Sequence, residues 1–292
     1  MTAPARITPV YQGLSRTIEV PSCVLSIDDL RKVFADLDAL TREATGKQVD
    51  GFVQPVGMSA SDFANSKSQV KKESGLTLYV FGKHGEQIAI TSPAAITRDA
   101  LPDRLSTVTF DSAASFKMQV NYDPMNRFRL VFDFTESPLL GNHDPWSQPT
   151  PNLSAFEIVG ADQTWVAGVA DKVLSFLRAR KRSRRWLHGA GTFTLLNWIV
   201  GIPAALWLIY RWDGLIQRVT GGLPSALRAV VYIYVFLLLL LFFRGLFYLV
   251  RWLFPIIELE GSRSKAARAI GGIIVVGLVT TLIYDVLKAA FQ

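Results

Sequence analysis

The highest density of charged side chains lies at residues 178–185, where six of the eight positions in RARKRSRR are cationic. Side chains of this kind bind phosphates, which nucleic acids and anionic lipid headgroups both carry. A basic run directly before an apolar segment also fixes the direction in which that segment enters a membrane. We therefore expect contacts with an anionic ligand or with lipid from Arg178, Arg180, Lys181, Arg182, Arg184 and Arg185.

A second cationic group lies on two segments of alternating polarity, 115–123 and 127–134. Apolar residues at every second position predict a β-hairpin with one buried face. Lys117, Arg127 and Arg129 then lie on the opposite face, where they could contact an anionic ligand. The alternative is an ordinary solvent-exposed face of mixed charge.

Three polar residues, Asn197, Arg244 and Asp285, interrupt long apolar stretches. Polar groups inside a bilayer are costly, so each is a candidate functional residue. In antiparallel spans Asn197 and Arg244 reach a similar depth and could form a hydrogen bond or line a hydrated cavity. Alternatively, Arg244 extends its side chain to the headgroups. Asp285 lies near the other face of the membrane, where Arg211 and Arg228 are its expected partners.

The sequence contains no recognisable catalytic or metal-binding motif. A phosphate-binding glycine loop, an HExxH helix, a CxxC pair and a GxSxG elbow are all missing. The single cysteine, Cys23, excludes an internal disulfide, and His143-Asp144 alone is at most half of a metal site. We therefore expect no enzyme activity, no metal and no cofactor.

Three apolar stretches are long enough to cross a bilayer as helices, at residues 192–210, 229–250 and 269–291. A hydrocarbon core about 30 Å thick requires about 20 apolar residues in a helix. Tryptophans near the ends of these stretches are typical of membrane interfaces. We expect an all-α membrane domain of three transmembrane helices.

The charge distribution indicates which side of the membrane each part occupies. Residues 1–177 carry 16 Lys and Arg against 20 Asp and Glu, whereas residues 178–292 carry 15 against 4. The acidic N-terminal part argues against a general DNA-binding protein. Basic residues concentrate before the first span and between the second and third, so the N-terminus is expected inside and the C-terminus outside a bacterial inner membrane.

The N-terminal part, residues 1–177, is predicted to be a cytoplasmic α+β domain with a mostly antiparallel sheet and two main helices. Ser26 and Asp29 predict a capping box that opens the first helix, and the second begins near Asp162. Residues 59–74 are predicted as a loop that can include a helix. Beyond the hairpin described above, strands are expected at residues 16–20, 75–81, 87–91, 106–112 and 154–160.

Residues 178–191 are predicted to be a basic connector between this domain and a membrane domain at residues 192–292. The second main helix is expected to continue into the connector. A continuous helix would transmit a rotation or a pull from the domain to the membrane.

The connector RARKRSRRW and the three apolar stretches behind a soluble domain give a layout that resembles the transmembrane effectors of bacterial anti-phage systems. Within that group it is similar to the effector of the Hailong system. The resemblance implies an oligomeric channel kept shut by bound single-stranded DNA, and a soluble domain that senses a nucleotide or oligonucleotide. No role of an individual residue is carried over.

We therefore hypothesise a homo-oligomeric ion channel that permeabilises the membrane in anti-phage defence. Three helices from one chain cannot enclose a wide aqueous path, so several copies are required. In a tetramer the connectors would place about 24 positive charges around the inner mouth. The alternatives are a membrane-anchored binding or scaffold protein without a pore, and a subunit of a membrane enzyme or transporter.

Overall fold

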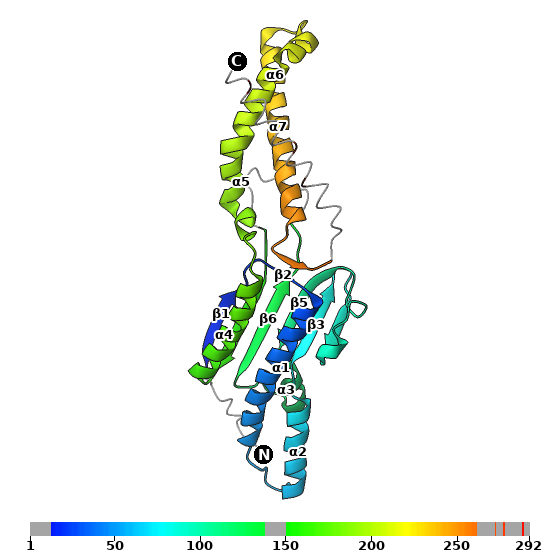
Figure 1. Ribbon diagram of the computed structural model, residues 1–292, viewed down its shortest axis with the longest axis vertical. Coiled ribbons are helices and arrows are strands. Elements are labelled where there is room, and N and C mark those ends of the chain that lie inside the picture. Colours follow the sequence, from blue (N-terminus) through cyan, green and yellow to red (C-terminus); the bar gives the residue numbers. More distant parts are fainter. Residues whose placement is uncertain (1–12, 138–149, 262–271, 273–276, 278–287, 289–292) are drawn as a thin grey trace, which may run out of the picture. The chain divides into compact units, whose positions relative to one another are not determined.

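The computed structural model describes residues 13–137 and 150–261, together with Gly272, Gly277 and Lys288. It divides into two compact units. The α+β unit comprises Met1–Thr135, Asn152–Arg182 and Ile257–Ser262, and the helical unit comprises Glu136–Pro151, Ser183–Ile256 and Arg263–Gln292. The chain thus leaves the α+β unit, forms the helical unit and returns (Figure 1).

The α+β unit is built on a six-stranded sheet in which every neighbouring pair is antiparallel. This confirms the expected α+β class and its antiparallel sheet. In spatial order the strands are β1 (Leu14–Glu19), β7 (Ala155–Gly160), β6 (Arg127–Asp133), β5 (Leu105–Asp111), β3 (Thr77–Gly82) and β4 (Gln87–Ile90).

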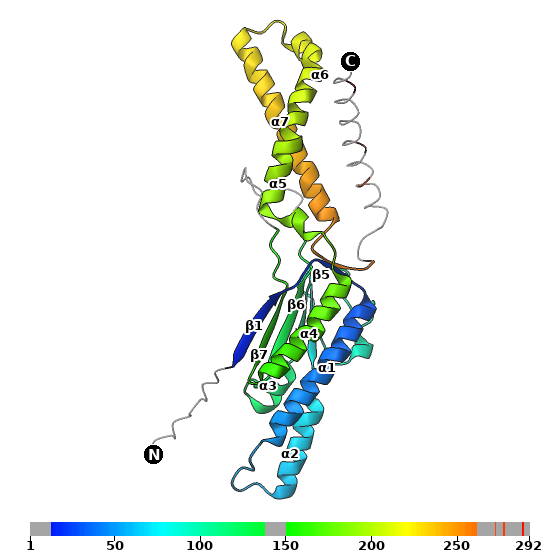
Figure 2. The same cartoon turned by 60° about the vertical axis from the view of Figure 1, so that its left-hand side comes forward.

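Two long helices, α1 (Ile27–Asp50) and α4 (Gln163–Arg180), cover one face of this sheet (Figure 2). Side chains of β6 and β7 largely alternate between buried and more exposed positions, and the buried set, together with Val108 and Phe110 of β5, faces the helices. Phe34 of α1 lies 6.4 Å from Phe110 of β5, and Phe128 of β6 stacks 6.4 Å from Trp165 of α4, measured between ring centroids. The core therefore lies between the sheet and these helices.

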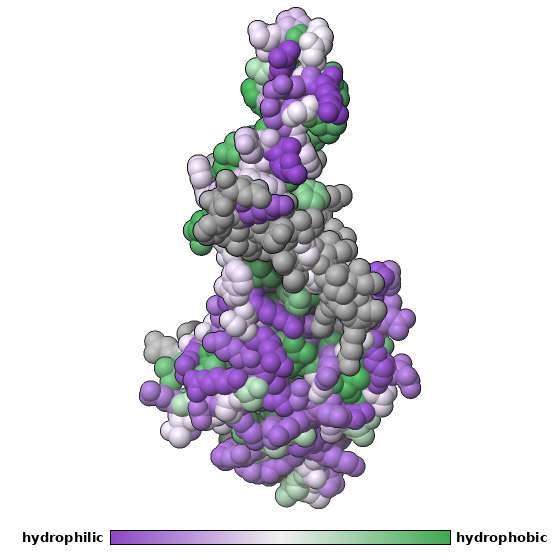
Figure 3. Space-filling view, turned by 45° about the horizontal axis from the view of Figure 1, so that its top comes forward, coloured by the Kyte–Doolittle hydropathy of each residue, from purple (hydrophilic) through white to green (hydrophobic). Residues whose placement is uncertain are grey.

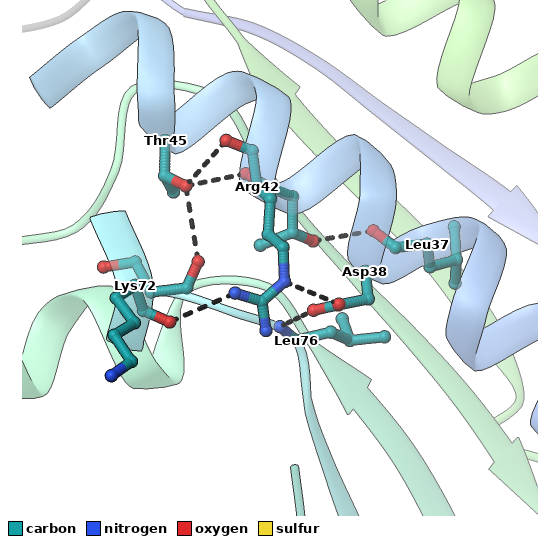
Figure 4. Close-up of polar contacts among 8 residues, drawn as sticks. Leu37, Asp38, Arg42, Thr45, Lys72 and Leu76 are labelled. Carbon is teal, nitrogen blue, oxygen red and sulfur yellow. Dashed lines mark hydrogen bonds and ion pairs between the residues drawn. The ribbon is translucent and has the colours of Figure 1, made fainter. Parts of the chain in front are cut away.

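The predicted capping box opens α1. The backbone N–H of Asp29 donates to the Ser26 hydroxyl, and the backbone N–H of Ser26 donates to the Asp29 carboxylate, both at 3.0 Å. Further along α1, Asp38 accepts from the backbone N–H of Leu76 at 2.8 Å, and Arg42 donates to Asp38 and to the Lys72 carbonyl (Figure 4). These bonds hold the middle of α1 against the start of β3.

Residues 59–74, predicted as a loop that can include a helix, form α2 (Ala60–Glu73). The Ser59 hydroxyl accepts from the backbone N–H of Asp62 at 3.1 Å, which satisfies a donor at the helix start. No residue of α2 is buried. The weak apolar pattern of this segment therefore reflects a surface helix paired with α1.

The expected strand at residues 115–123 is wrong, because this segment forms helix α3 (Ala114–Val120). The Asp111 carboxylate accepts from the N–H groups of Ala113 and Ala114, and Asn121 ends the helix in the left-handed conformation at φ 58°. Phe116 is buried, whereas Met118 is 73% exposed. Phe116 and Val120 fit a helical spacing as well as an alternating one, so the short pattern was ambiguous.

A second, small sheet was not predicted. Strand β2 (Cys23–Leu25) pairs in parallel with β8 (Ile257–Leu259), and Cys23 also forms an antiparallel bridge with Lys181. The Arg182 N–H donates to the Ser22 carbonyl at 2.8 Å, and the Glu260 N–H donates to the Leu25 carbonyl at 2.7 Å. We call residues 22–25, 181–182 and 257–260 the anchor sheet.

The helical unit contains a short 3-10 helix, η2 (Arg185–His188), followed by α5 (Ala190–Leu196), the π-helical turn η3 (Asn197–Gly201) and α6 (Ile202–Thr220). Helix α7 (Ser225–Leu253) then runs antiparallel to α6. Two stretches, Gly191–Thr220 and Ser225–Leu253, are long and apolar enough to cross a membrane. The expected third span, 269–291, lies outside the described residues.

Helix α4 enters the connector as expected, but the expected continuous helix from the α+β domain to the first span is wrong. Helix α4 ends at Arg180, and Lys181 is extended, with ψ 135°. Gly189 is also extended, with ψ 149°, between η2 and α5. The chain extends because Lys181 and Arg182 pair with Ser22 and Cys23 in the anchor sheet.

Candidate functional site

The anchor sheet divides the basic connector into two groups with different surroundings. Arg178, Arg180, Lys181 and Arg182 belong to the α+β unit, and Arg184 and Arg185 belong to the helical unit. Four of the six residues are exposed: Arg178, Lys181, Arg182 and Arg185.

Arg180 is engaged within the α+β unit. Its guanidinium forms an ion pair with Asp29 and stacks 4.0 Å from the ring centre of Phe176. Burial raises the pKa of Asp29, but hydrogen bonds from Arg180 and Ser26 outweigh it and leave the pKa below its ordinary value. Arg180 thus joins the end of α4 to the first turn of α1, one turn from the anchor sheet.

Arg184 and Arg251 hold the other end of the connector within the helical unit. The Arg251 guanidinium, 1% exposed, donates to the carbonyls of Leu187 and Gly189, both at 2.8 Å, and Arg184 lies over the Phe254 ring. Arg251 directly follows the second predicted span, 229–250, where the sequence alone shows one more basic residue of the following loop. Its place in the last turn of a helix was the available signal, because side chains there can reach nearby carbonyls.

His188 is a second buried polar residue at this end of the connector, with 3% of its surface exposed. Its Nε2 lies 2.8 Å from the Phe254 carbonyl and its Nδ1 lies 2.9 Å from the Thr150 hydroxyl. Because a carbonyl only accepts, Nε2 carries the proton and Nδ1 accepts from Thr150 in the neutral ring. Burial, with Arg251 and Arg184 nearby, lowers the pKa of His188, although the bond to Phe254 opposes this.

The α6–α7 hairpin carries apolar side chains on its outer surface (Figure 3). In a water-soluble protein such side chains would be buried against other elements. Many in α6 and α7 are more than half exposed, among them Leu206, Tyr210, Leu215, Val219, Leu227, Ile233, Tyr234, Leu238 and Leu241. Leu195 of α5 and Trp198 and Ile199 of η3 are more than half exposed as well. No charged residue lies between 190 and 210 or between 229 and 243.

Asn197 and Arg244 lie in the same section of the hairpin, because the contacts Phe193–Phe247 and Asp213–Tyr232 bracket both. They do not form the predicted hydrogen bond through the amide oxygen, since Asn197 Oδ1 is buried without a partner among the described residues. Arg244 donates to the Tyr248 hydroxyl at 3.3 Å. Asp285 lies outside the part of the chain that is described.

The π-helical turn at Asn197 has a cause in the sequence. Pro203 has no N–H and cannot close the normal helical hydrogen bond with Ile199. The Ile202 N–H instead reaches back five residues to the Asn197 carbonyl. A turn of this kind widens the helix where the Asn197 side chain lies against Gly201.

The group Lys117, Arg127 and Arg129 does not form one face. Lys117 lies on α3 and pairs with Asp123 at 3.1 Å, and Arg127 donates to the Pro124 carbonyl at 3.1 Å. Arg129 is exposed on β6. Only Arg127 and Arg129 share a sheet face, the one opposite α1 and α4.

Within the described ranges, no group of three or more His, Cys, Asp or Glu side chains is arranged to hold a metal ion. The chain matches no protein-family model, no curated protein and no solved structure. The function proposed next therefore rests on the geometry and chemistry of this chain alone.

Proposed function

We propose that this chain is a membrane-integral effector whose α+β unit senses an intracellular signal and controls an ion path formed by several copies. The observation that carries the proposal is the apolar hairpin, whose ends both begin at the anchor sheet. A bilayer gives its exposed apolar side chains the hydrocarbon surroundings that water does not. Helix α7 is about 43 Å long, which exceeds the hydrocarbon thickness of about 30 Å.

The anchor sheet supports a proposal for the topology of the hairpin. Lys181 and β8 both pair with β2, so the chain returns to the α+β unit after the hairpin. A segment that starts and ends on one side of a membrane crosses it an even number of times. We therefore propose that α6 crosses outward and α7 crosses back, with the basic connector on the cytoplasmic side.

The same sheet supports a coupling role for the α+β unit. Strand β2 leads directly into the Ser26 cap of α1, and Asp29 in the first turn of α1 holds Arg180. A ligand that moves α1 would therefore act on both ends of the hairpin at once. The exposed cations Arg178, Lys181 and Arg182 make a nucleotide or a single-stranded nucleic acid the ligand class we propose.

The two long apolar helices among the described residues cannot enclose an aqueous path by themselves, so the proposed conducting form is a homo-oligomer, with a tetramer as the working assumption. Arg244 and Asn197 are the polar groups that we place along this path. Both lie in otherwise apolar sections of the hairpin, where a charged group is costly unless water or another polar group reaches it.

The test is ion flux through liposomes that contain the purified chain. We expect flux, and we expect Arg244→Ala to change the ratio of anion to cation permeability. Arg218→Ala, which removes an exposed arginine near the far end of α6, should leave this ratio unchanged. Absence of flux with nucleotides and oligonucleotides of every size tested, or a single-chain particle in detergent, would contradict the proposal and favour a membrane-anchored scaffold.

A further inference from the structure

One face of the six-stranded sheet is covered by α1 and α4, whereas the other carries no helix over strands β1, β7, β6 and β5 in the described α+β unit (Figures 1 and 2). Arg129 and Glu157 are exposed at the centre of this uncovered face. Val131 and Ala155, beside them, are partly exposed. This surface therefore combines opposite charges with an adjacent apolar pair.

The strand register brings these residues into rows. Arg129 is directly opposite Glu157, and Val131 is directly opposite Ala155. Although they are neighbours, Arg129 and Glu157 form no ion pair with each other in the described structure. Both charges are therefore available to a surface that presents the reverse order.

We propose that this face binds the same face of a second copy of the chain. A two-fold axis that runs between β6 and β7, parallel to them, places Arg129 of each copy over Glu157 of the partner. The same rotation places Val131 over Ala155 of the partner. Sheets pack about 10 Å apart, a gap that arginine and glutamate side chains from facing strands bridge together.

The outer strands agree with this arrangement. Thr17 of β1 is opposite Glu157, and Asp111 of β5 is opposite Arg129, so one row reads Thr17, Glu157, Arg129, Asp111 across four strands. The two-fold rotation sets Thr17 over Asp111 of the partner, a hydroxyl donor over a carboxylate acceptor. The row is therefore complementary to itself.

The contact is small. Four strands about 4.8 Å apart and about 19 Å long present less than the about 800 Å² per partner of a typical stable interface. Such a surface contributes to assembly when the membrane already holds the copies at a high local concentration. The inference rests on the proposed function only for the statement that the chain assembles.

Cross-linking of the full chain in detergent tests the interface. One tagged chain carries Val131→Cys, a second carries Ala155→Cys, and a short bismaleimide joins them if the faces meet. The native Cys23 does not compete, because it is buried and burial raises the pKa of its thiol to about 12. A chain with Ala89→Cys, on the same face but outside the overlap, replaces Ala155→Cys as the control.

We expect a cross-linked heterodimer at least tenfold above the Ala89→Cys control. Arg129→Glu in both chains should remove it, because the row then brings like charges together. Arg129→Glu in one chain and Glu157→Arg in the other should restore it, since both contacts become complementary again. Restoration cannot come from repair within one chain, because each chain carries a single charge reversal.

A yield of cross-linked heterodimer no higher than that of the Ala89→Cys control would overturn the proposed interface. A yield that neither charge reversal changes would overturn it as well. If ion flux persists in that case, the proposed function stands without it. If the charge-dependent cross-link forms while liposomes conduct nothing, the interface stands and the proposed conducting function fails.

Discussion

At the scale of single residues, His188 shows how burial gives a side chain a pH-dependent effect on stability. The neutral ring fits its surroundings, with Nε2 donating to Phe254 and Nδ1 accepting from Thr150. A protonated ring would lie buried near Arg184 and Arg251, and burial lowers the pKa of His188. The unfolded chain therefore binds a proton at a higher pH than the folded chain does.

This difference in proton binding makes the free energy of unfolding depend on pH. As the pH falls below the ordinary histidine pKa of about 6.5, the unfolded state gains a proton first, and the free energy of unfolding decreases until the folded state is protonated too. We expect His188→Gln, which keeps a donor for the Phe254 carbonyl, to reduce this pH dependence. Urea unfolding in detergent between pH 7.5 and 5 measures it.

The matched control for this variant is His84→Gln, which changes an exposed histidine in the turn between β3 and β4. It should keep the pH dependence of the unmodified chain. If the free energy of unfolding changes with pH in the same way in His188→Gln and in the unmodified chain, His188 is not the source of the pH dependence.

At the scale of elements, the π-helical turn in the first apolar helix depends on a close fit. The Asn197 amide lies where a side chain on Gly201 would begin. We expect Gly201→Ala to lower the stability of the hairpin by about 1–3 kcal/mol, because the added methyl group displaces the amide. Asn197→Ala in the same chain should remove most of this loss. Thermal unfolding in detergent of the single and double variants measures the coupling.

Gly214→Ala is the control for this pair, because a side chain at Gly214 of α6 meets nothing within 4 Å. Alanine favours helix over glycine by up to about 1 kcal/mol, so this variant should be neutral or stabilising. Additive effects of Gly201→Ala and Asn197→Ala would contradict the proposed contact.

Local signals made much of the α+β unit predictable. The capping box at Ser26 and Asp29 is a pattern within one turn, and the alternation in β6 and β7 reflects one buried face. The strand prediction for residues 115–123 failed because a seven-residue helix is too short for its apolar period to be distinguished from that of a strand. The anchor sheet gave no signal, since its strands β2 and β8 lie more than 200 positions apart in sequence.

The candidate site was predictable in composition but not in arrangement. The six basic residues and the two apolar stretches are visible in the sequence. The division of the connector is not, because it depends on the pairing of Lys181 and Arg182 with residues 22–23. Arg251 was likewise read as one more positive charge, since the sequence does not show the two carbonyls that it reaches.

At the scale of the whole molecule, the proposed function requires a hairpin that crosses the membrane and returns. Both of its ends join the anchor sheet, so the turn between α6 and α7 should lie on the opposite side of the bilayer from the α+β unit. Nothing in this expectation depends on the ligand, the number of copies or the presence of a pore.

Cysteine labelling from each side of the membrane tests this claim most directly. Gly222→Cys places a thiol in the exposed turn between α6 and α7, and Glu260→Cys places one just after β8. In intact cells stripped of any outer membrane, an impermeant maleimide should label Gly222→Cys at once and Glu260→Cys only after permeabilisation. Labelling of both positions from the same side would contradict the hairpin topology and the function built on it.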